Sequence, residues 1–120
     1  MESVEDLDVF KMAHELVLDV YRQTQHFPDE EKFGLTPQMR RAAFSVPMNL
    51  AEGASRLGRK EYRHFVSIAR GSVGEIRYQL ILARDLGYIQ AKTYERLRAQ
   101  FDTIARMLTG LAKSLATRVG

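Results

Sequence analysis

Metal binding is the first chemistry that the residue types suggest, because one Glu-x-x-His motif is present. Glu61 and His64 are spaced so that both side chains would lie on one face of a helix. Di-metal carboxylate sites in helical bundles need two such motifs and two further carboxylates. Neither His14 nor His26 has a glutamate three residues earlier, and basic neighbours of His64 would repel a cation. We therefore expect no metal site and no cofactor.

Nucleophilic catalysis also lacks the residues that it requires. The sequence contains no Gly-x-Ser-x-Gly motif, no phosphate-binding loop and no dinucleotide-binding glycine pattern. Cysteine is absent, which excludes disulfide scaffolds, thiol catalysis and cysteine-ligated zinc. Ser72 follows Gly71 in the middle of a predicted helix and is interpreted as a small packing residue. We expect a protein that is not an enzyme and has no catalytic residues.

Three polar residues, Asn49, Glu52 and Glu75, lie on otherwise apolar predicted helices. Polar groups that are buried need hydrogen-bond partners, so these residues predict a buried polar network. No general base or metal ligand accompanies them, and the network is therefore interpreted as structural rather than catalytic.

The most informative charged residues form a row of arginines in one predicted helix. Arg63, Arg70, Arg77 and Arg84 are seven residues apart and therefore share one stripe of the helix. We call these four residues the arginine row. None of them has an acidic residue three or four positions away, so the row is unpaired within its own helix. The basic residues near the row are Arg40, Arg41, Arg56, Arg59 and Lys60.

Two interpretations of the arginine row stay open. In the first, phosphates of a nucleic acid, with RNA favoured, occupy the row and give a salt-dependent affinity. The residues expected to contact phosphates are Arg56, Arg59, Lys60, Arg63, Arg70 and Arg77. In the second, acids of the first helix such as Asp8, Glu15 and Asp29 pair with the row between subunits, because the first and third helices of an up-down bundle are diagonal. No aromatic residues are interleaved with the row, which disfavours stacking on single strands.

The distribution of charge along the 120 residues is uneven. The net charge is −7 over residues 1–31, +6 over residues 32–70 and +4 over residues 71–120, which gives +3 for the chain. Such asymmetry is compatible with an anionic partner, and also with packing of the acidic segment against the basic remainder.

The composition is typical of a folded domain: apolar residues make up 45% and charged residues 28%. The N-terminus is acidic where a signal peptide would be basic, and no apolar run approaches the roughly 18 residues of a membrane span. We therefore expect a cytoplasmic protein with no membrane contact and no small-molecule substrate.

Four segments carry apolar residues at three- and four-residue steps, and no strand-like alternation separates them. The first predicted helix spans residues 7–25, with Asp6 or Asp8 as its N-cap. The connector that follows contains Phe27 and Phe33, which we expect to be buried.

The second predicted helix has Thr36 as its N-cap and Pro37 as its first helical residue. It ends where Gly53 and Gly58 turn the chain. Pro47 lies inside the helix and removes one amide donor, so we expect a kink there.

The third predicted helix spans residues 59–86 and ends at Gly87, which has the usual place of a C-terminal glycine. Gly71 and Gly74 weaken this helix and predict the close approach of another helix. The fourth predicted helix has an apolar seam with alternating spacings of three and four, which favours left-handed bundle packing. The seam residues are Tyr94, Leu97, Phe101, Ile104, Leu108, Leu111 and Leu115.

Short connections between these helices predict an all-α fold, an up-down-up-down antiparallel four-helix bundle with a kinked second helix. The chain has no linker or internal repeat, so we expect a single domain over residues 1–120. Some apolar residues lie off the core stripes and would leave apolar patches on a monomer. They are Phe44, Val46, Met48, Val66, Ile81, Leu82 and Met107.

A series of short motifs from residue 7 to about residue 88 resembles a known family. The second predicted helix and the residues before it contain Phe33-Gly34-Leu35, Gln38, Arg40-Arg41-Ala42, Ser45, Asn49-Leu50-Ala51-Glu52-Gly53 and Arg56. The third contains Phe65, Ala69-Arg70-Gly71-Ser72, Glu75, Gln79-Leu80 and Ala83, and the first contains Leu7, Ala13, Leu16 and Tyr21. This series resembles the signature of the bacterial four-helix bundle family named for 23S rRNA intervening sequences. Phe10 and Leu50 depart from it, since the family often has tryptophan and isoleucine there.

The resemblance implies a homopentameric ring of four-helix bundles and no enzymatic activity. It implies an interface or structural role for Arg41, Asn49, Glu52, Gly53, Gly71, Ser72 and Glu75. The chain is similar to the accessory variability determinant of diversity-generating retroelements, a basic pentamer that binds nucleic acid and a reverse transcriptase. We therefore expect a non-catalytic homopentamer that binds nucleic acid through its basic surface, with RNA as the favoured ligand. The alternative is a structural or protein-interaction module, a scaffold for a partner such as a reverse transcriptase.

Overall fold

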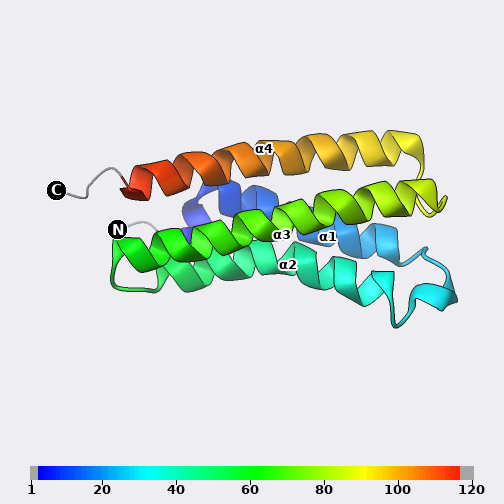
Figure 1. Cartoon of the computed structure of the whole chain (residues 1–120), viewed down its shortest axis with the longest axis horizontal. Coiled ribbons are helices and arrows are strands. Elements are labelled where there is room, and N and C mark those ends of the chain that lie inside the picture. The colour runs from blue at the N-terminus through cyan, green and yellow to red at the C-terminus, as the bar shows by residue number, and fades with distance from the viewer. Residues whose placement is uncertain (1–2, 117–120) are drawn as a thin grey trace.

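The computed structural model describes residues 3–116, which form four α-helices and two short 3-10 turns. The helices are α1 (Asp8–Thr24), α2 (Leu35–Ala54), α3 (Arg59–Asp85) and α4 (Ala91–Ala116), and the turns are η1 (Val4–Asp6) and η2 (Asp29–Glu31). No strand occurs in this part of the chain, so the predicted all-α fold is confirmed. Successive helices run in opposite directions along the long axis, as an up-down-up-down bundle requires (Figure 1).

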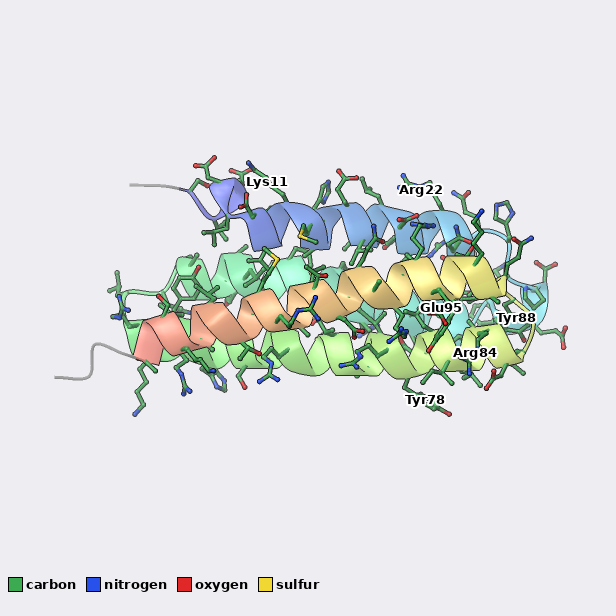
Figure 2. All side chains as sticks on the ribbon, turned by 90° about the horizontal axis from the view of Figure 1, so that it is seen from above. Lys11, Arg22, Tyr78, Arg84, Tyr88 and Glu95 are labelled. Atoms are coloured by element: carbon green, nitrogen blue, oxygen red, sulfur yellow. The ribbon has the colours of Figure 1, made fainter. Side chains whose placement is uncertain are left out.

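Each helix packs against two neighbours in a molecule of 51 × 24 × 20 Å. The pairs α2–α3 and α3–α4 are the most extensive, whereas α1 packs on α2 and α4. Figure 2 shows α1 and α3 at opposite edges of the bundle with α4 in front of them. The first and third helices are therefore diagonal, as expected for this topology.

The predicted seam of α4 supplies one side of the core. Its first five members, from Tyr94 to Leu108, are buried, and its last two, Leu111 and Leu115, are half-buried. Among the residues expected to lie off the core stripes, Val46 and Val66 are instead fully buried, so that expectation was wrong for them. Both valines lie on the main buried stripe of their helix: Val46 falls between Ala43 and Leu50, and Val66 lies three residues before Ala69.

Other apolar residues do stay outside the core. Met48 is 60% exposed, and Ile81 is also exposed. In the connector after α1, Phe27 is buried against the ring of Tyr88, but Phe33 is 89% exposed, contrary to expectation. The η2 turn directs Phe33 into solvent, where its ring lies against the ammonium group of Lys32.

The beginnings of α1 and α2 differ from the predicted caps. The N-cap of α1 is Leu7, which makes no side-chain cap, and Asp6 instead accepts a hydrogen bond from the Ser3 amide within η1. The N-cap of α2 is Gly34 rather than Thr36, and the Leu35 amide donates to Glu31 Oε1 at 2.9 Å. The Glu31 carboxylate thus accepts a hydrogen bond from an amide at the start of α2, and the N-cap residue Gly34 needs no side chain for this.

Glycines mark the end of α3 and a close approach of α2 to α3. Gly87 has φ +79°, and the Tyr88 and Gly87 amides donate to the carbonyls of Ala83 and Arg84, which is the Schellman arrangement. At Gly53, a Cβ atom would lie 2.8 Å from Phe65 Cβ. Side chains larger than glycine therefore do not fit between α2 and α3 at this level.

Gly71 and Gly74 do not have the role predicted for them within this chain. A Cβ atom at either position would have no atom within 4 Å, so no helix of the described chain approaches them. Both glycines are exposed on the outer surface of α3. Pro47 is buried inside α2, and the kink expected there stays a prediction.

Candidate nucleic-acid interface

The arginine row lies along α3 where it adjoins α4. Arg63 Nε donates to the Ala112 carbonyl of α4 at 3.2 Å. Arg77 Nε lies 3.2 Å from Asp102 Oδ1, an ion pair without hydrogen-bond geometry. Arg84 pairs with Asp85 at 2.9 Å. Arg63 and Arg77 thus find partners on the neighbouring helix. Arg84 pairs with the last residue of α3, so the expectation that the row is unpaired within its own helix was wrong for Arg84.

Arg70 is the exception in the row. It is exposed and forms no hydrogen bond or ion pair with any residue in the range 3–116. The acids of the first helical segment do not approach the row either, since Asp8, Glu15 and Asp29 form no ion pair within the described chain. The acidic residue of α1 that does pair is Asp19, with Arg96 of α4 at 2.8 Å.

Arg59 and Arg63 both donate hydrogen bonds to carbonyls in the last two turns of α4. Arg59 donates to the carbonyls of Ser114 at 2.7 Å and Leu115 at 3.4 Å. Cations near the C-terminal end of a helix interact favourably with its dipole. Both arginines therefore stabilise the tertiary structure before any ligand is considered.

Of the remaining residues predicted to contact phosphates, one is paired within the chain and one is free. Arg56 pairs with Glu52 at 2.8 Å and with Glu61 at 3.7 Å, and its guanidinium lies 4.9 Å from the ring centre of Phe65. Lys60, by contrast, is exposed and has no partner in the described residues. Among the six residues expected to contact phosphates, the free cations are thus Lys60 and Arg70.

Two arginines of α4 extend the basic surface and were not singled out from the sequence. Arg98 pairs with Asp102 at 3.2 Å, so one carboxylate lies between Arg77 and Arg98. Arg106, about two turns further along than Arg98, is exposed and donates to Thr103 Oγ1. The sequence shows only that these residues share one helix; that α4 brings them beside the arginine row depends on helix packing.

The charge on Arg84 is secured by its surroundings. Its hydrogen bond to Asp85 raises the pKa of the guanidinium above its ordinary value, although partial burial opposes this. Its guanidinium also lies 4.4 Å from the ring centre of Tyr94, a cation–π contact. Arg84 is therefore a permanent charge whose orientation is set by two neighbours.

The polar network between α2 and α3 has different members from those predicted. Asn49 Nδ2 donates to Ser45 Oγ at 2.9 Å, and Ser45 Oγ lies 2.8 Å from Ser72 Oγ. Ser72 is buried, as its interpretation as a packing residue requires. Glu52 and Glu75 are exposed and take no part in this network, so the expectation that they would join it was wrong.

The Glu-x-x-His motif has no metal-site geometry. Glu61 pairs with Arg56, and the His64 ring packs edge-on against Phe65 at 5.5 Å. The described residues contain no group of three or more side chains that could hold a metal ion. Within the same residues, no helix is both long enough and apolar enough to cross a membrane.

Comparisons with known proteins agree on family and fold. Residues 5–110 match the family model described as 23S rRNA-intervening sequence protein. The fold is similar to the crystal structure of a protein of unknown function from the S23 ribosomal protein family of Bacteroides thetaiotaomicron VPI-5482. The TM-score is 0.81 at 23% identity, with 88% of this chain and 98% of that chain covered, a likeness that concerns the fold alone. No curated protein shows significant similarity to the chain.

Proposed function

The chain belongs to the 23S rRNA-intervening sequence protein family, and we propose that it is a non-catalytic homo-oligomer that binds nucleic acid through the arginine row. A pentamer is the proposed assembly, RNA the favoured ligand and the cytoplasm the proposed location. Each subunit would present one row on its α3–α4 surface, so an oligomer would multiply the phosphate contacts.

The exposed, unpaired guanidinium of Arg70 is the feature that supports this proposal best. It lies in the middle of the row, is exposed, and has no partner within residues 3–116. A guanidinium binds phosphate through paired hydrogen bonds, and no charged neighbour has to be displaced first. Its neighbour in the row, Arg77, has a side chain that is 50% exposed, so a phosphate can still approach it beside Asp102.

We rank the six residues expected to contact phosphates by the partners that each already has in the described chain. Arg70 and Lys60 are proposed as the principal contacts, because neither has a partner in the described chain. Arg63 and Arg77 are proposed as secondary contacts that are shared with α4. Arg56 and Arg59 are proposed to be mainly structural, because Arg56 pairs with Glu52 and Arg59 donates to the Ser114 carbonyl. For both residues this proposal replaces the phosphate contact expected from the sequence.

Binding of a labelled, structured RNA, followed by fluorescence anisotropy across a salt series, tests the proposal. We expect the logarithm of the affinity to fall steeply with the logarithm of salt concentration, as several phosphate contacts require. Arg70→Gln should lower the magnitude of this slope by about one and leave assembly intact. Arg22→Gln is the matched control, because it removes the same charge from an exposed site on α1.

Either of two outcomes contradicts nucleic-acid binding through the row. One is no binding of RNA at low salt by the wild-type chain. The other is equal loss of affinity in the Arg70 and Arg22 variants, since a general effect of net charge would then explain the binding. If the double replacement of Arg63 and Arg70 by glutamine dissolves the assembly, the row is structural instead.

The second candidate is a structural or protein-interaction module, such as a scaffold for a reverse transcriptase. It is supported by the partners that Arg56, Arg59 and Arg77 already have within the chain, which reduce the charge available to phosphate. In this alternative the arginines pair across subunits with acids of the first segment. Loss of assembly after replacement of Glu15 and Asp29 would support it, whereas unchanged assembly would count against it.

A further inference from the structure

Asp102 of α4 lies between arginines on the face where α3 and α4 adjoin, the face seen in Figure 2. Its Oδ1 atom is 3.2 Å from Arg77 Nε, and its Oδ2 atom is 3.2 Å from Arg98 Nη1. One carboxylate thus pairs with one arginine from each helix. Phosphates of a nucleic acid would have to compete with this carboxylate for the same cations.

The side chain of Asp102 is less exposed than those of two other acids that pair with arginines nearby. Asp102 is 23% exposed, whereas Asp85 and Glu95 are 61% and 63% exposed. An exposed carboxylate can turn away into solvent when an anionic ligand approaches. Asp102 has less freedom to do so, because it is enclosed where α4 packs against α3.

The contact between Asp102 and Arg77 is incompletely formed. Asp102 Oδ1 is buried and accepts no hydrogen bond in the described residues, since its ion pair with Arg77 lacks hydrogen-bond geometry. Arginine binds an anion most strongly through two parallel hydrogen bonds. The side chain of Arg77 is also 50% exposed, and ion pairs exposed to solvent are weak. Arg77 can therefore leave Asp102 for a ligand that offers better hydrogen bonds.

Repulsion by Asp102 would act on any phosphate that Arg77 binds. Such a phosphate would lie closer to the Asp102 carboxylate than the Debye length, which is about 8 Å at physiological ionic strength. Salt would therefore screen this repulsion only in part. Arg70, the preceding member of the arginine row, forms no ion pair in residues 3–116. The two neighbouring arginines should thus contribute unequally to phosphate binding.

We propose that Asp102 limits the affinity of the α3–α4 surface for RNA. Its carboxylate occupies Arg77 in the free chain, so a phosphate gains this arginine only by displacing an ion pair and approaching a negative charge. A ligand that binds Arg70 and its neighbours at the same time can meet this cost, whereas an isolated phosphate group cannot. The inference rests on the proposed function and assigns the residue that sets the strength of the same site.

Removal of the charge of Asp102 tests the inference, with the labelled RNA and the salt series described above. Asp102→Asn keeps the size of the side chain and should lower the dissociation constant about tenfold at low salt. The salt dependence should become steeper by about one, because Arg77 then makes a full phosphate contact. Arg98 should add less to this gain, since it keeps its ion pair with Glu95 at 3.3 Å.

Asp29→Asn is the matched control for the charge. It removes the same charge from an exposed residue of η2 that forms no ion pair in the described chain. Its dissociation constant should stay within about twofold of the wild-type value, because the lost charge does not act on the arginine row at short range. Asp102→Glu keeps the carboxylate and should also bind RNA nearly as the wild type does. Circular dichroism and urea denaturation verify the fold of each variant.

A double-mutant cycle tests whether the gain in affinity depends on Arg77. Arg77→Gln should weaken binding by no more than about threefold in the wild-type background, where Asp102 occupies the arginine. The same change should remove most of the tenfold gain in the Asp102→Asn background. If Asp102 served only the packing of α4 on α3, Arg77→Gln would have the same effect in both backgrounds.

The outcomes separate this inference from the proposed function. A wild-type chain that binds no RNA at low salt overturns the proposed function and this inference with it. RNA binding by the wild type, with equal affinities of the Asp102→Asn and Asp29→Asn variants, overturns the inference alone. Equal effects of Arg77→Gln in the two backgrounds also overturn it. If Asp102→Asn does not fold, equal losses of affinity from Arg70→Gln and Arg77→Gln in the wild type would contradict the unequal roles given to these arginines.

Discussion

Gly53 sets the distance between α2 and α3, and its substitution has a definite steric consequence. Gly53→Ala places a Cβ atom 2.8 Å from Phe65 Cβ and 3.2 Å from the Tyr62 carbonyl oxygen. Neither atom is the end of a flexible side chain, so the helices must separate. We expect a loss of about 1–3 kcal/mol in the free energy of unfolding, measured by urea denaturation.

The control for Gly53 is another helical glycine with open space around it. Gly110 of α4 would have nothing within 4 Å of an added Cβ atom. Gly110→Ala should therefore stabilise the chain by about 0.5–1 kcal/mol, because alanine is the better helix former. Equal effects of the two substitutions would show that helix propensity, and not the α2–α3 distance, determines the result.

Glu31 predicts a pH dependence of stability. The Leu35 amide, and then the Tyr88 hydroxyl, lower the pKa of its carboxyl in the folded chain. This stabilisation is fully present above the pKa of the unfolded chain, and it is lost as the pH falls through the lower pKa of the folded chain. We expect the stability difference between wild type and Glu31→Gln to shrink as the pH falls from about 6 to about 3.

Thermal melts across this pH range measure the effect of Glu31. Tyr88→Phe keeps the Leu35 hydrogen bond and removes the second one, so it should show part of the same change. A stability difference that does not vary with pH would contradict the role given to the ionised carboxylate.

At the scale of whole helices, the end of α4 depends on arginines from α3. Arg59 and Arg63 donate to carbonyls in the last two turns of α4. Replacement of both by glutamine should destabilise the chain by about 0.5–1 kcal/mol and accelerate amide exchange at the C-terminal end of α4. Hydrogen exchange measured by NMR can verify this locally.

Lys60 is the matched control for the end of α4. It lies between the two arginines in sequence and has no partner in the described chain. Lys60→Gln should leave amide exchange in α4 unchanged while it weakens RNA binding. Faster exchange in this variant as well would mean that net charge, rather than the hydrogen bonds of the arginines, holds the end of α4.

At the scale of the whole molecule, assembly should be visible in thermal stability. If only folded chains associate, the melting temperature rises with protein concentration by mass action. We expect this rise for the wild-type chain, measured by calorimetry over a wide concentration range. A melting temperature that does not depend on concentration in the wild type would contradict a homo-oligomeric native state.

Much of the fold followed from local patterns in the sequence. The four helices, the α4 seam and the turn at Gly87 were all predicted, because helix periodicity and backbone preference depend on residues near one another in the chain. The caps of α1 and α2 were predicted wrongly. Asp6 accepts a hydrogen bond from the Ser3 amide instead of capping α1, and Glu31 accepts one from the Leu35 amide at the start of α2. These bonds form in short turns before each helix, and the helical periodicity does not specify the conformation of those turns.

The candidate site was also predictable only where its features depend on local sequence. The sequence by itself determined that four arginines share a stripe of α3 and that none of them has an acid three or four positions away in that helix. Only the tertiary structure decided that Arg63 and Arg77 meet α4 whereas Arg70 stays free in the described chain. The physical reason is that periodicity fixes which side chains share a face of one helix, while a partner on another helix depends on the distance and register at which the two helices pack.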